Sequence, residues 1–150
     1  MVKFMLGSGL PDNLLLLSLG FIRSDVIPAD GRNSRRFFMP PEEIAQKLEQ
    51  CVRTRSFRKR DFSLQELSEK VSIPERYLRL YFKNELNTCF RQWRMDVRME
   101  EACEKMLSEP DRTVLSIAHE LGFDDLSNFH RQFRRATGCT PNQWRKSRSS

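Results

Sequence analysis

Two segments of this chain, about fifty residues apart, share one pattern: a short amphipathic helix, a tight turn and a second amphipathic helix. The first copy is expected at about residues 63–83 and the second at about residues 114–135. In a helix-turn-helix the second helix can enter the major groove of DNA, and two copies can read two grooves. The repeat therefore predicts an all-α fold with two helix-turn-helix subdomains.

The second copy has the clearer turn. Gly122 tolerates the left-handed conformation that ends a helix, and the apolar Phe123 follows it. Asp124 or Asp125 can then cap the next helix. Helical spacing predicts the buried faces of the two helices, which consist of Val114, Ile117, Ala118, Leu121, Phe129 and Phe133.

The first copy uses different residues at the same places. Ser63 and Glu66 have the spacing of a capping box, and Pro74 suits the first turn of the second helix. Ser72 is the weak point of the match, because it occupies the turn position that Gly122 holds in the other copy. The residues expected to face inward are Leu64, Leu67, Val71, Leu78, Tyr81 and Phe82.

One uninterrupted helix is predicted between the copies, from Phe90 to about Leu107, because this stretch contains no glycine or proline. At 1.5 Å per residue it spans roughly 27 Å. With the width of the motif at each end, the two second helices are expected about 34 Å apart, which is the rise of one DNA turn. Thr113 can cap the helix that follows. Apolar residues near helical spacing in the long helix are Trp93, Val97, Ala102 and Met106.

Motifs at fixed spacings run through both copies. Around the second copy they are Ile117-Ala118, Gly122-Phe123, Phe129, Phe133-Arg134, Gly138, Thr140-Pro141 and Trp144-Arg145; before it stand Leu64, Leu67, Tyr77-Leu78, Arg98 and Ala102. Together they resemble the C-terminal signature of AraC/XylS-type transcription regulators over roughly residues 60–147. The resemblance implies two helical subdomains joined by the long helix, binding to promoter DNA, usually activation of transcription, and RNA polymerase as a partner.

The resemblance also implies which part of the chain binds DNA. Residues 41–147 would form the DNA-binding domain, followed by a short tail at 148–150. The second helices, at about 74–83 and 125–135, would be the recognition helices, inserted in adjacent major grooves. Departures from the family pattern are Leu80 in place of an arginine that contacts DNA, Asn87 in place of a glycine, and Cys89 in place of a capping serine.

Side chains of the recognition helices that suit base edges are expected to read sequence, because arginine matches guanine and the shorter polar groups serve several bases. The residues expected to contact bases are Arg76, Arg79, Leu126, Ser127, His130 and Arg131. Cationic side chains expected to contact phosphates are Lys83, Arg134, Arg135 and Arg145. Each also has a plainer interpretation: exposed arginines are often solvated surface, and Leu126 could equally be a packing residue.

Charge supports a polyanionic partner. The chain has 26 Lys plus Arg against 20 Asp plus Glu, a net charge of +6 and a pI near 9.5. From Leu126 to Ser150 there is no carboxylate at all, so binding to DNA is expected to depend strongly on salt. A second basic cluster, at residues 53–60, could follow phosphates, but a linker is the favoured interpretation.

Other functional classes have weaker support. The four cysteines show no metal-type spacing and are expected to be reduced thiols of a cytoplasmic protein. The family resemblance implies that this protein is bacterial and nucleoid-associated. No catalytic, cofactor or metal site is expected, so the chain is predicted not to be an enzyme. A DNA-repair protein of the methyl-acceptor type would need a zinc-held cysteine cluster. A helical module that binds protein would be indicated by binding that is insensitive to salt.

The first forty residues are different in kind. The apolar run from Leu14 to Ile22 is too short to cross a bilayer, and residues 28–41 have the composition of a linker or extended loop. Residues 1–40 are expected to be either a native N-terminal extension or the remnant of a larger domain, with a sensor or effector domain absent from this chain. No membrane contact is expected for residues 41–150.

Overall fold

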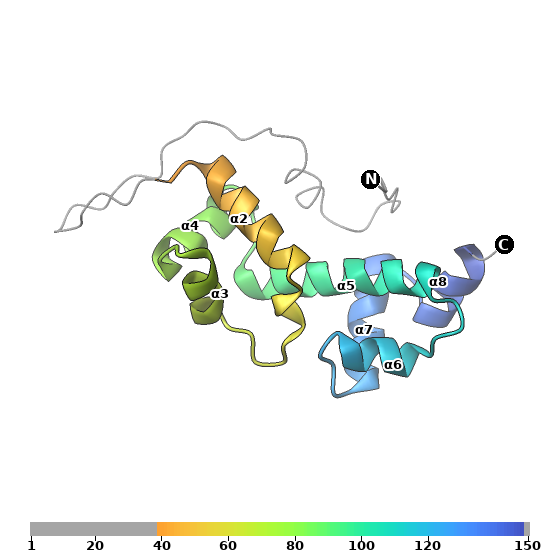
Figure 1. The fold of residues 1–150 in the computed structure, drawn as a ribbon. Coiled ribbons are helices and arrows are strands. Elements are labelled where there is room, and N and C mark those ends of the chain that lie inside the picture. The colour runs from red at the N-terminus through yellow and green to blue at the C-terminus, as the bar shows by residue number, and fades with distance from the viewer. Residues whose placement is uncertain (1–38, 149–150) are drawn as a thin grey trace. The chain divides into compact units, whose positions relative to one another are not determined.

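The computed structural model describes residues 39–148, and within them every regular element is a helix. In chain order these are α2 (Pro41–Arg53), a 3-10 helix η1 (Ser56–Arg58), α3 (Leu64–Val71), α4 (Glu75–Asn84), α5 (Phe90–Ser108), α6 (Val114–Glu120), α7 (Leu126–Thr137) and α8 (Pro141–Arg148) (Figure 1). The predicted all-α class is confirmed. Residues 1–38 of the N-terminal extension predicted at 1–40, and the last two residues of the predicted tail, lie outside the described residues.

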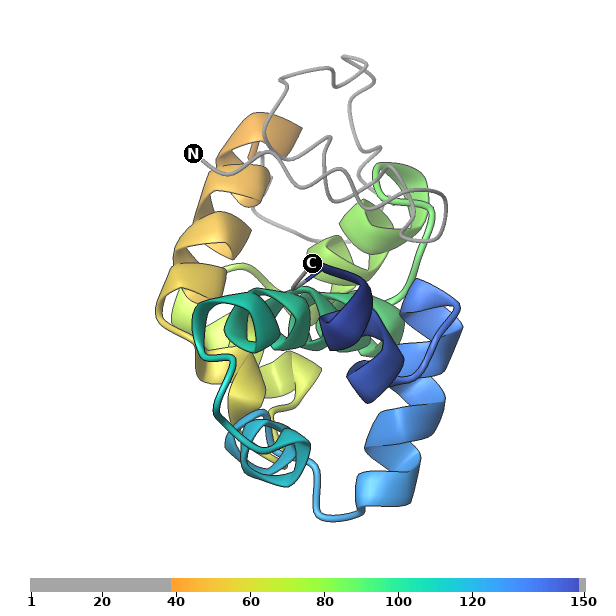
Figure 2. The same cartoon turned by 90° about the vertical axis from the view of Figure 1, so that its right-hand side faces the viewer.

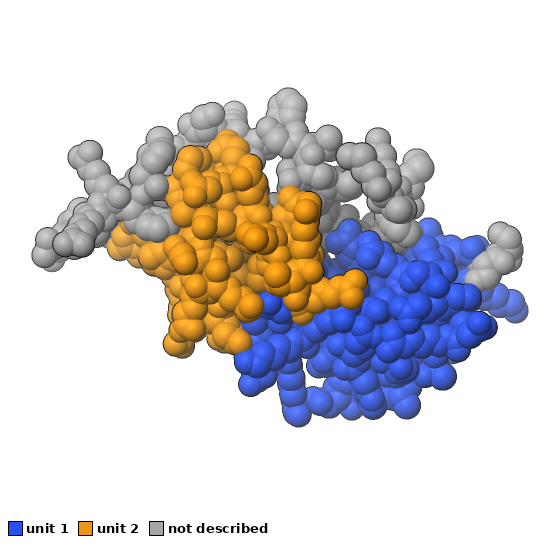
Figure 3. Space-filling model, in the orientation of Figure 1, with its two compact units in different colours: residues 1–11, 56–62, 91–150 blue, residues 12–55, 63–90 orange. Residues whose placement is uncertain are grey.

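The described residues divide into two compact units (Figure 3). Unit 2 comprises residues 39–55 and 63–90 and contains the first helix-turn-helix, α3 and α4. Unit 1 comprises residues 56–62 and 91–148 and contains the second, α6 and α7. The long helix α5 starts at the last residue of unit 2 and belongs to unit 1 from Arg91 onward.

In unit 2, local sequence signals explain where the helices begin and end. The Ser63 hydroxyl accepts a hydrogen bond from the Glu66 N–H at 3.1 Å, which caps α3. Ser72 ends α3 in the left-handed conformation, at φ 56° and ψ 41°, so a serine takes the place that glycine has in the other copy. Pro74 is the cap residue of α4 rather than its first helical residue.

Unit 2 has its own apolar core. The predicted inward residues of α3 and α4 are all buried, and α2 adds Ile44, Leu48 and Cys51 from one side. Tyr81 packs edge-on against Phe82, with ring centroids 6.3 Å apart. Burial of the Tyr81 hydroxyl raises its pKa well above the ordinary value, and this oxygen has no hydrogen-bond partner among the described residues.

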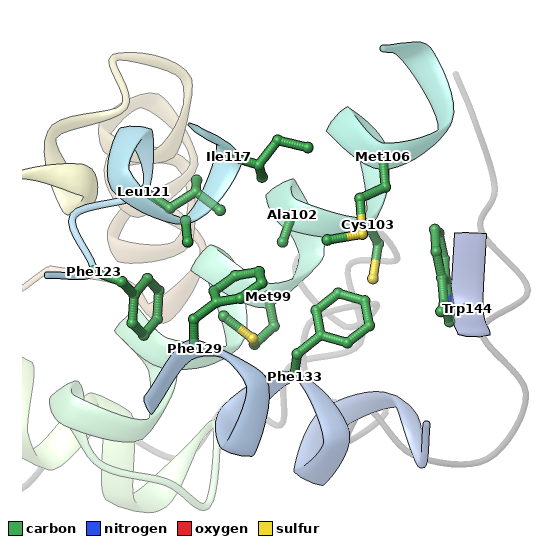
Figure 4. Packing of buried hydrophobic residues seen from close by; sticks show 11 residues of the cluster. Met99, Ala102, Cys103, Met106, Ile117, Leu121, Phe123, Phe129, Phe133 and Trp144 are labelled. Carbon is green, nitrogen blue, oxygen red and sulfur yellow. The ribbon is translucent and has the colours of Figure 1, made fainter. Parts of the chain in front are cut away.

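The core of unit 1 forms between α5 and the three helices that follow it. Figure 4 shows Met99, Ala102, Cys103 and Met106 of α5 facing Ile117, Leu121, Phe129, Phe133 and Trp144. The ring of Phe133 meets that of Trp144 edge-on, with centroids 6.0 Å apart. α6 and the first turns of α7 lie below α5 in both Figure 1 and Figure 2. The aromatic residues predicted as core are therefore confirmed as core.

The linker interpretation of the basic cluster at residues 53–60 is wrong for the part of it that lies within the segment 56–62. This segment is part of unit 1, where Phe57 and Phe62 are both 2% exposed. Apolar side chains of this size bury a large area, so the segment is fixed by packing rather than free. The chain thus contributes to unit 1 before it forms the first helix-turn-helix, and returns to unit 1 afterwards.

No helix within residues 39–148 has the length and apolar character needed to span a bilayer.

Candidate nucleic-acid interface

The outward face of α4 is basic. Arg76, Arg79 and Lys83 are exposed, and their spacing of three and four residues places them on one side of the helix. The opposite side carries the buried aromatic and aliphatic residues of unit 2. The cations predicted to meet DNA from this helix are therefore brought together on an accessible face.

Two of these arginines have partners on α4 itself. The Arg79 Nη2 donates to Glu75 Oε2 at 2.8 Å, across one turn of the helix. The Arg76 guanidinium lies over the Tyr77 ring, 5.0 Å from its centroid, and its Nη2 donates to the Tyr77 hydroxyl at 3.1 Å. Each of these two side chains is therefore held toward a neighbour on its own helix.

The start of α7 is fixed by an aspartate. Asp125 is the cap residue, and its carboxylate accepts hydrogen bonds from the backbone N–H groups of Ser127 at 2.9 Å and Asn128 at 3.2 Å. Asp124 instead pairs with Arg60 at 2.8 Å. Of the two aspartates that the sequence offered as caps, the second has this role.

The outward face of α7 is basic and contains no acidic residue. Ser127, Arg131, Arg134 and Arg135 are exposed. The Arg131 Nη2 donates to the Asn128 Oδ1 at 3.0 Å, which holds the arginine against its own helix. Polar and cationic groups of this kind can meet base edges and phosphates.

Three predicted contact residues lie partly inside the protein. Leu126 packs against the core of unit 1, and His130 is half-buried beside Phe129, with its Nε2 lacking a hydrogen-bond partner among the described residues. Arg145 is half-buried, and its Nη1 donates to the Pro110 carbonyl at 3.1 Å. The DNA contacts of these three residues stay predictions, as do those of the exposed residues.

Three polar residues at these faces were given no role in DNA binding from the sequence, although Glu75 was expected on the outward face. Asn128 and Gln132 are half-buried on α7, and the Gln132 amide lies 3.5 Å from the Asn128 Oδ1. Glu75 stands at the first turn of α4. The amides could have been found by considering every polar residue of the helix, since Asn and Gln suit adenine. A search for cations alone passes over Glu75.

A charge network supports α6, the helix before α7. Its members are Arg58, Glu101, Lys105, Glu109, Arg112 and Glu120. Glu120 is its centre, with an oxygen 2.7 Å from Arg58 Nη1 and 2.9 Å from Lys105 Nζ. Burial alone would raise the pKa of Glu120, but hydrogen bonds from Lys105 and Arg112 outweigh burial and lower the pKa to about 2.

Two arginines of α5 hold the segment 56–62 by its backbone. The Arg94 Nε and the Arg98 Nε donate to the Phe57 carbonyl at 3.1 and 3.0 Å, and their Nη2 atoms reach the next carbonyls of the segment. The Arg98 guanidinium also lies 5.3 Å from the ring centroid of Phe123. Burial, together with the Arg94 charge, lowers the pKa of Arg98 to about 10, so it stays charged at neutral pH.

The turn of the second copy closes against this segment. Gly122 has φ +82°, and a Cβ built on it would lie 2.1 Å from the Arg58 carbonyl oxygen. Glycine is required here both for the backbone angle and for the close approach. The α6–α7 turn is therefore positioned by residues that precede the first helix-turn-helix in the chain.

Within residues 39–148 no group of three or more His, Cys, Asp or Glu side chains is placed to share a metal ion. The four cysteines are free thiols: Cys51 and Cys103 are buried, Cys139 is half-buried and Cys89 is exposed. Burial raises the pKa of the Cys103 thiol to about 12.

Comparison with known proteins assigns the family. A family model described as a helix-turn-helix domain matches residues 67–147, which include both recognition helices. The chain belongs to the AraC-type helix-turn-helix family. The transcriptional activator RhaR of Escherichia coli K12 is 31% identical over 108 residues, which cover 71% of this chain. The chain spans only 38% of the length of RhaR.

Solved structures of the AraC-type family have the same fold. The C-terminal domain of AraT, a response regulator from Geobacillus stearothermophilus, is 30% identical with a TM-score of 0.60, over 69% of this chain and 84% of that domain. The DNA-binding domain of the global transcriptional factor AdpA, solved with a target DNA, is 20% identical with a TM-score of 0.58. It covers 70% of this chain and 91% of the AdpA chain, and its likeness shows the fold alone.

Proposed function

We propose that this protein is a sequence-specific, double-stranded DNA-binding regulator of transcription. The observation that carries the proposal is the outward face of each recognition helix, where α4 presents Arg76, Arg79 and Lys83 and α7 presents Arg131, Arg134 and Arg135. Two exposed basic helix faces, each in a helix-turn-helix, are the arrangement that meets major grooves. Membership of the AraC-type family supports the same function.

The finer parts of the proposal rest on family resemblance. We propose activation rather than repression, because the matching relative RhaR is named an activator. RNA polymerase is the expected protein partner, and an effector would act through a sensor domain outside this chain. A regulator of this kind works in the bacterial cytoplasm at the nucleoid. The two recognition helices are proposed to enter adjacent major grooves on one face of the duplex.

The proposed division of labour follows from side-chain chemistry. Arginines that can donate two hydrogen bonds discriminate guanine, whereas lysine acts as a point charge on phosphate. Arg76, Arg79, Ser127 and Arg131 are therefore the proposed readers, with smaller roles for the half-buried Leu126 and His130. Lys83, Arg134, Arg135 and Arg145 are the proposed phosphate contacts, and Arg145 has the least free side chain of the four.

Selection of preferred sequences from a random duplex pool tests this function. We expect two short, unlike blocks of preferred bases centred about one helical turn, or 10 bp, apart. Two blocks follow because one chain supplies two recognition helices of different sequence. Recovery of no preferred sequence, or binding that does not weaken between low and high salt, would contradict the proposal.

Variants then separate readers from phosphate contacts. Arg131→Ala should weaken binding to the selected site by about 1 to 3 kcal/mol and relax the preference at one base position. Lys83→Ala should weaken binding to all sequences alike and reduce the salt slope by about one. Arg53→Ala is a matched control, because Arg53 is an exposed arginine of α2 outside both recognition helices. Equal losses for Arg131→Ala on selected and random DNA would show that Arg131 is not a reader.

A further inference from the structure

The acidic residue of α4 occupies an unexpected place for a helix that meets DNA. Glu75 lies in the first turn of α4, on the flank of the basic face, and its side chain is 38% exposed. A carboxylate at a helix N-terminus favours helix formation, but near phosphates it opposes binding. Glu75 therefore lowers the affinity of α4 for DNA unless it has a favourable partner on the bases.

The bond between Glu75 and Arg79 explains what the carboxylate can do. Arg79 donates from Nη2 to Glu75 Oε2 at 2.8 Å and makes no other hydrogen bond with the described residues. A guanidinium has five N–H donors, so Nε and Nη1 remain available for a ligand. Exposed ion pairs of this type are weak, so the bond adds little stability and only favours this direction of the guanidinium.

The chemistry of a G·C base pair matches this pair of side chains. In the major groove guanine presents the N7 and O6 acceptors, and the amino group of its cytosine is a donor on the same edge. Arginine can donate two hydrogen bonds to guanine, while a neighbouring carboxylate accepts from the cytosine N4. Thymine O4, guanine O6 and phosphate oxygens are acceptors and would repel the same carboxylate, whereas the adenine N6 amino group is a donor, so it is the pairing of Arg79 with guanine that selects cytosine over adenine.

We propose that Glu75 is a specificity-determining residue: Glu75 and Arg79 read one G·C base pair as a unit, with Arg79 on the guanine and Glu75 on its cytosine. The same carboxylate weakens binding to phosphates and to other base pairs, so it widens the gap between specific and random DNA. This inference rests on the proposed DNA-binding function and names one base pair of the site.

The second recognition helix provides the contrast. Arg131 on α7 is also held by an acceptor on its own helix, but that acceptor is the neutral Asn128 amide at 3.0 Å. An amide carries no charge and has an N–H₂ donor as well as an oxygen. The α7 pair can therefore hold its arginine without excluding bases that present acceptors, and a bias toward a base with an amino group, which is cytosine in the G·C pair, is expected from α4 only.

The experiment compares four proteins: wild type, Glu75→Gln, Glu75→Asp and the control Glu49→Gln. Glu49 pairs with Arg53 at 2.7 Å across one turn of α2, so Glu49→Gln removes another exposed ion pair, somewhat more exposed than that of Glu75, outside the recognition helices. Each full chain is titrated with the selected duplex, with its three substitutions at the base pair whose preference Arg79→Ala relaxes, and with random duplex. Thermal unfolding checks that the variants fold.

For Glu75→Gln, the ratio of affinities for the G·C site and for the substituted sites should fall about tenfold, and affinity for random DNA should rise. Glu75→Asp shortens the side chain by one methylene but keeps its charge, so the ratio should fall while affinity for random DNA stays unchanged. Glu49→Gln should leave the ratio unchanged. If Glu75→Gln unfolds, Glu75→Asp decides the outcome.

Two results overturn the inference in distinguishable ways. A wild type that selects no sequence overturns the proposed DNA-binding function and this inference with it. A wild type that selects a sequence, with both Glu75 variants keeping the wild-type ratio within twofold, overturns the role of Glu75 and leaves the DNA-binding function standing.

Discussion

The two helix-turn-helix copies share one motif but are stabilised from different sources. In unit 2 the first copy is held by local caps and by an apolar core, and its turn has an exposed serine at φ 56°. In unit 1 the second copy has a glycine turn closed against the segment 56–62, and Arg58 of that segment pairs with residues 43 and 62 positions away. Both copies depend on residues outside their own sequence: the first packs on apolar side chains of α2, whereas the second is held by backbone contact and ion pairs with the segment 56–62.

The recognition helices differ in charge as well. α7 contains no carboxylate, and the only acidic residue in α4 is Glu75. If the proposed function holds, the second copy contributes more to affinity for any DNA, and the first contributes more to discrimination. Two copies of one motif in a single chain can therefore differ both in what stabilises them and in how much each contributes to recognising the DNA sequence.

Gly122→Ala should have the largest effect on this comparison. The added Cβ would overlap the Arg58 carbonyl oxygen, which is backbone, at a φ that alanine rarely adopts. Both the clash and the strain act in the folded state, so we expect a loss of about 3 kcal/mol or more in the free energy of unfolding. Urea unfolding followed by circular dichroism measures this. A loss below about 1 kcal/mol would show that the turn of the second copy can move away from segment 56–62 at little cost in stability.

Arg58→Met should have the next largest effect on stability. The arginine pairs with Glu101, whose side chain is only 10% exposed, and with Glu120. Its removal leaves Glu101 buried without this partner, and we expect a loss of about 2 to 4 kcal/mol in the free energy of unfolding. Arg79→Met removes an exposed pair from the first copy and should cost at most about 0.5 kcal/mol. Similar losses for the two variants would remove the difference between the copies.

Acid should weaken the second copy through Glu120. The pKa of this carboxyl is about 2 in the folded protein against an ordinary value of 4.5, so folding favours its ionised form. That stabilisation is fully present above about pH 4.5 and is lost as the pH falls toward 2. Because the group is partly exposed, we expect its share to be about 1 to 2 kcal/mol.

Glu120→Gln isolates this contribution from other carboxyls. Burial raises the pKa values of Asp96 and Glu100, and protonation of these groups at low pH acts in the opposite direction. Both are present in wild type and variant, so the difference in unfolding free energy between the two proteins cancels them. That difference should be largest at pH 6 and should shrink toward pH 2.5. A difference that does not change with pH would place the effect of Glu120 in packing rather than charge.

Features that depend on neighbours in sequence could be predicted from the sequence. The caps at Ser63, Thr113 and Asp125 need only a side chain and an N–H two or three residues later. The buried stripes follow from helical spacing, and the same spacing put Arg76, Arg79 and Lys83 on an exposed face.

Features that depend on residues far apart in the chain could not be predicted from the sequence. Arg58 stands in a run of basic residues, for which the sequence predicts exposure to solvent. Its partners Glu101 and Glu120 are far along the chain and cannot be paired with it from the sequence. Half-burial of His130 and Arg145 was equally hidden; the partner of Arg145, the Pro110 carbonyl, is 35 residues away in the chain. Glu75 has a local partner in Arg79, but its proposed role depends on the DNA that α4 is proposed to bind.

Ser72→Gly should have the smallest effect, and the opposite sign to Gly122→Ala. The left-handed conformation of Ser72 costs free energy that glycine avoids, but glycine also loses more conformational freedom on folding. The position is exposed, so no packing is lost, and we expect a net gain of about 0.5 kcal/mol and about 2 °C in Tm. Thermal unfolding measures the shift, with Asn87→Gly as a second left-handed position in the same unit. A loss of stability in Ser72→Gly would mean that the serine side chain itself stabilises the turn. We infer instead that the turn of the first copy only tolerates serine at this position.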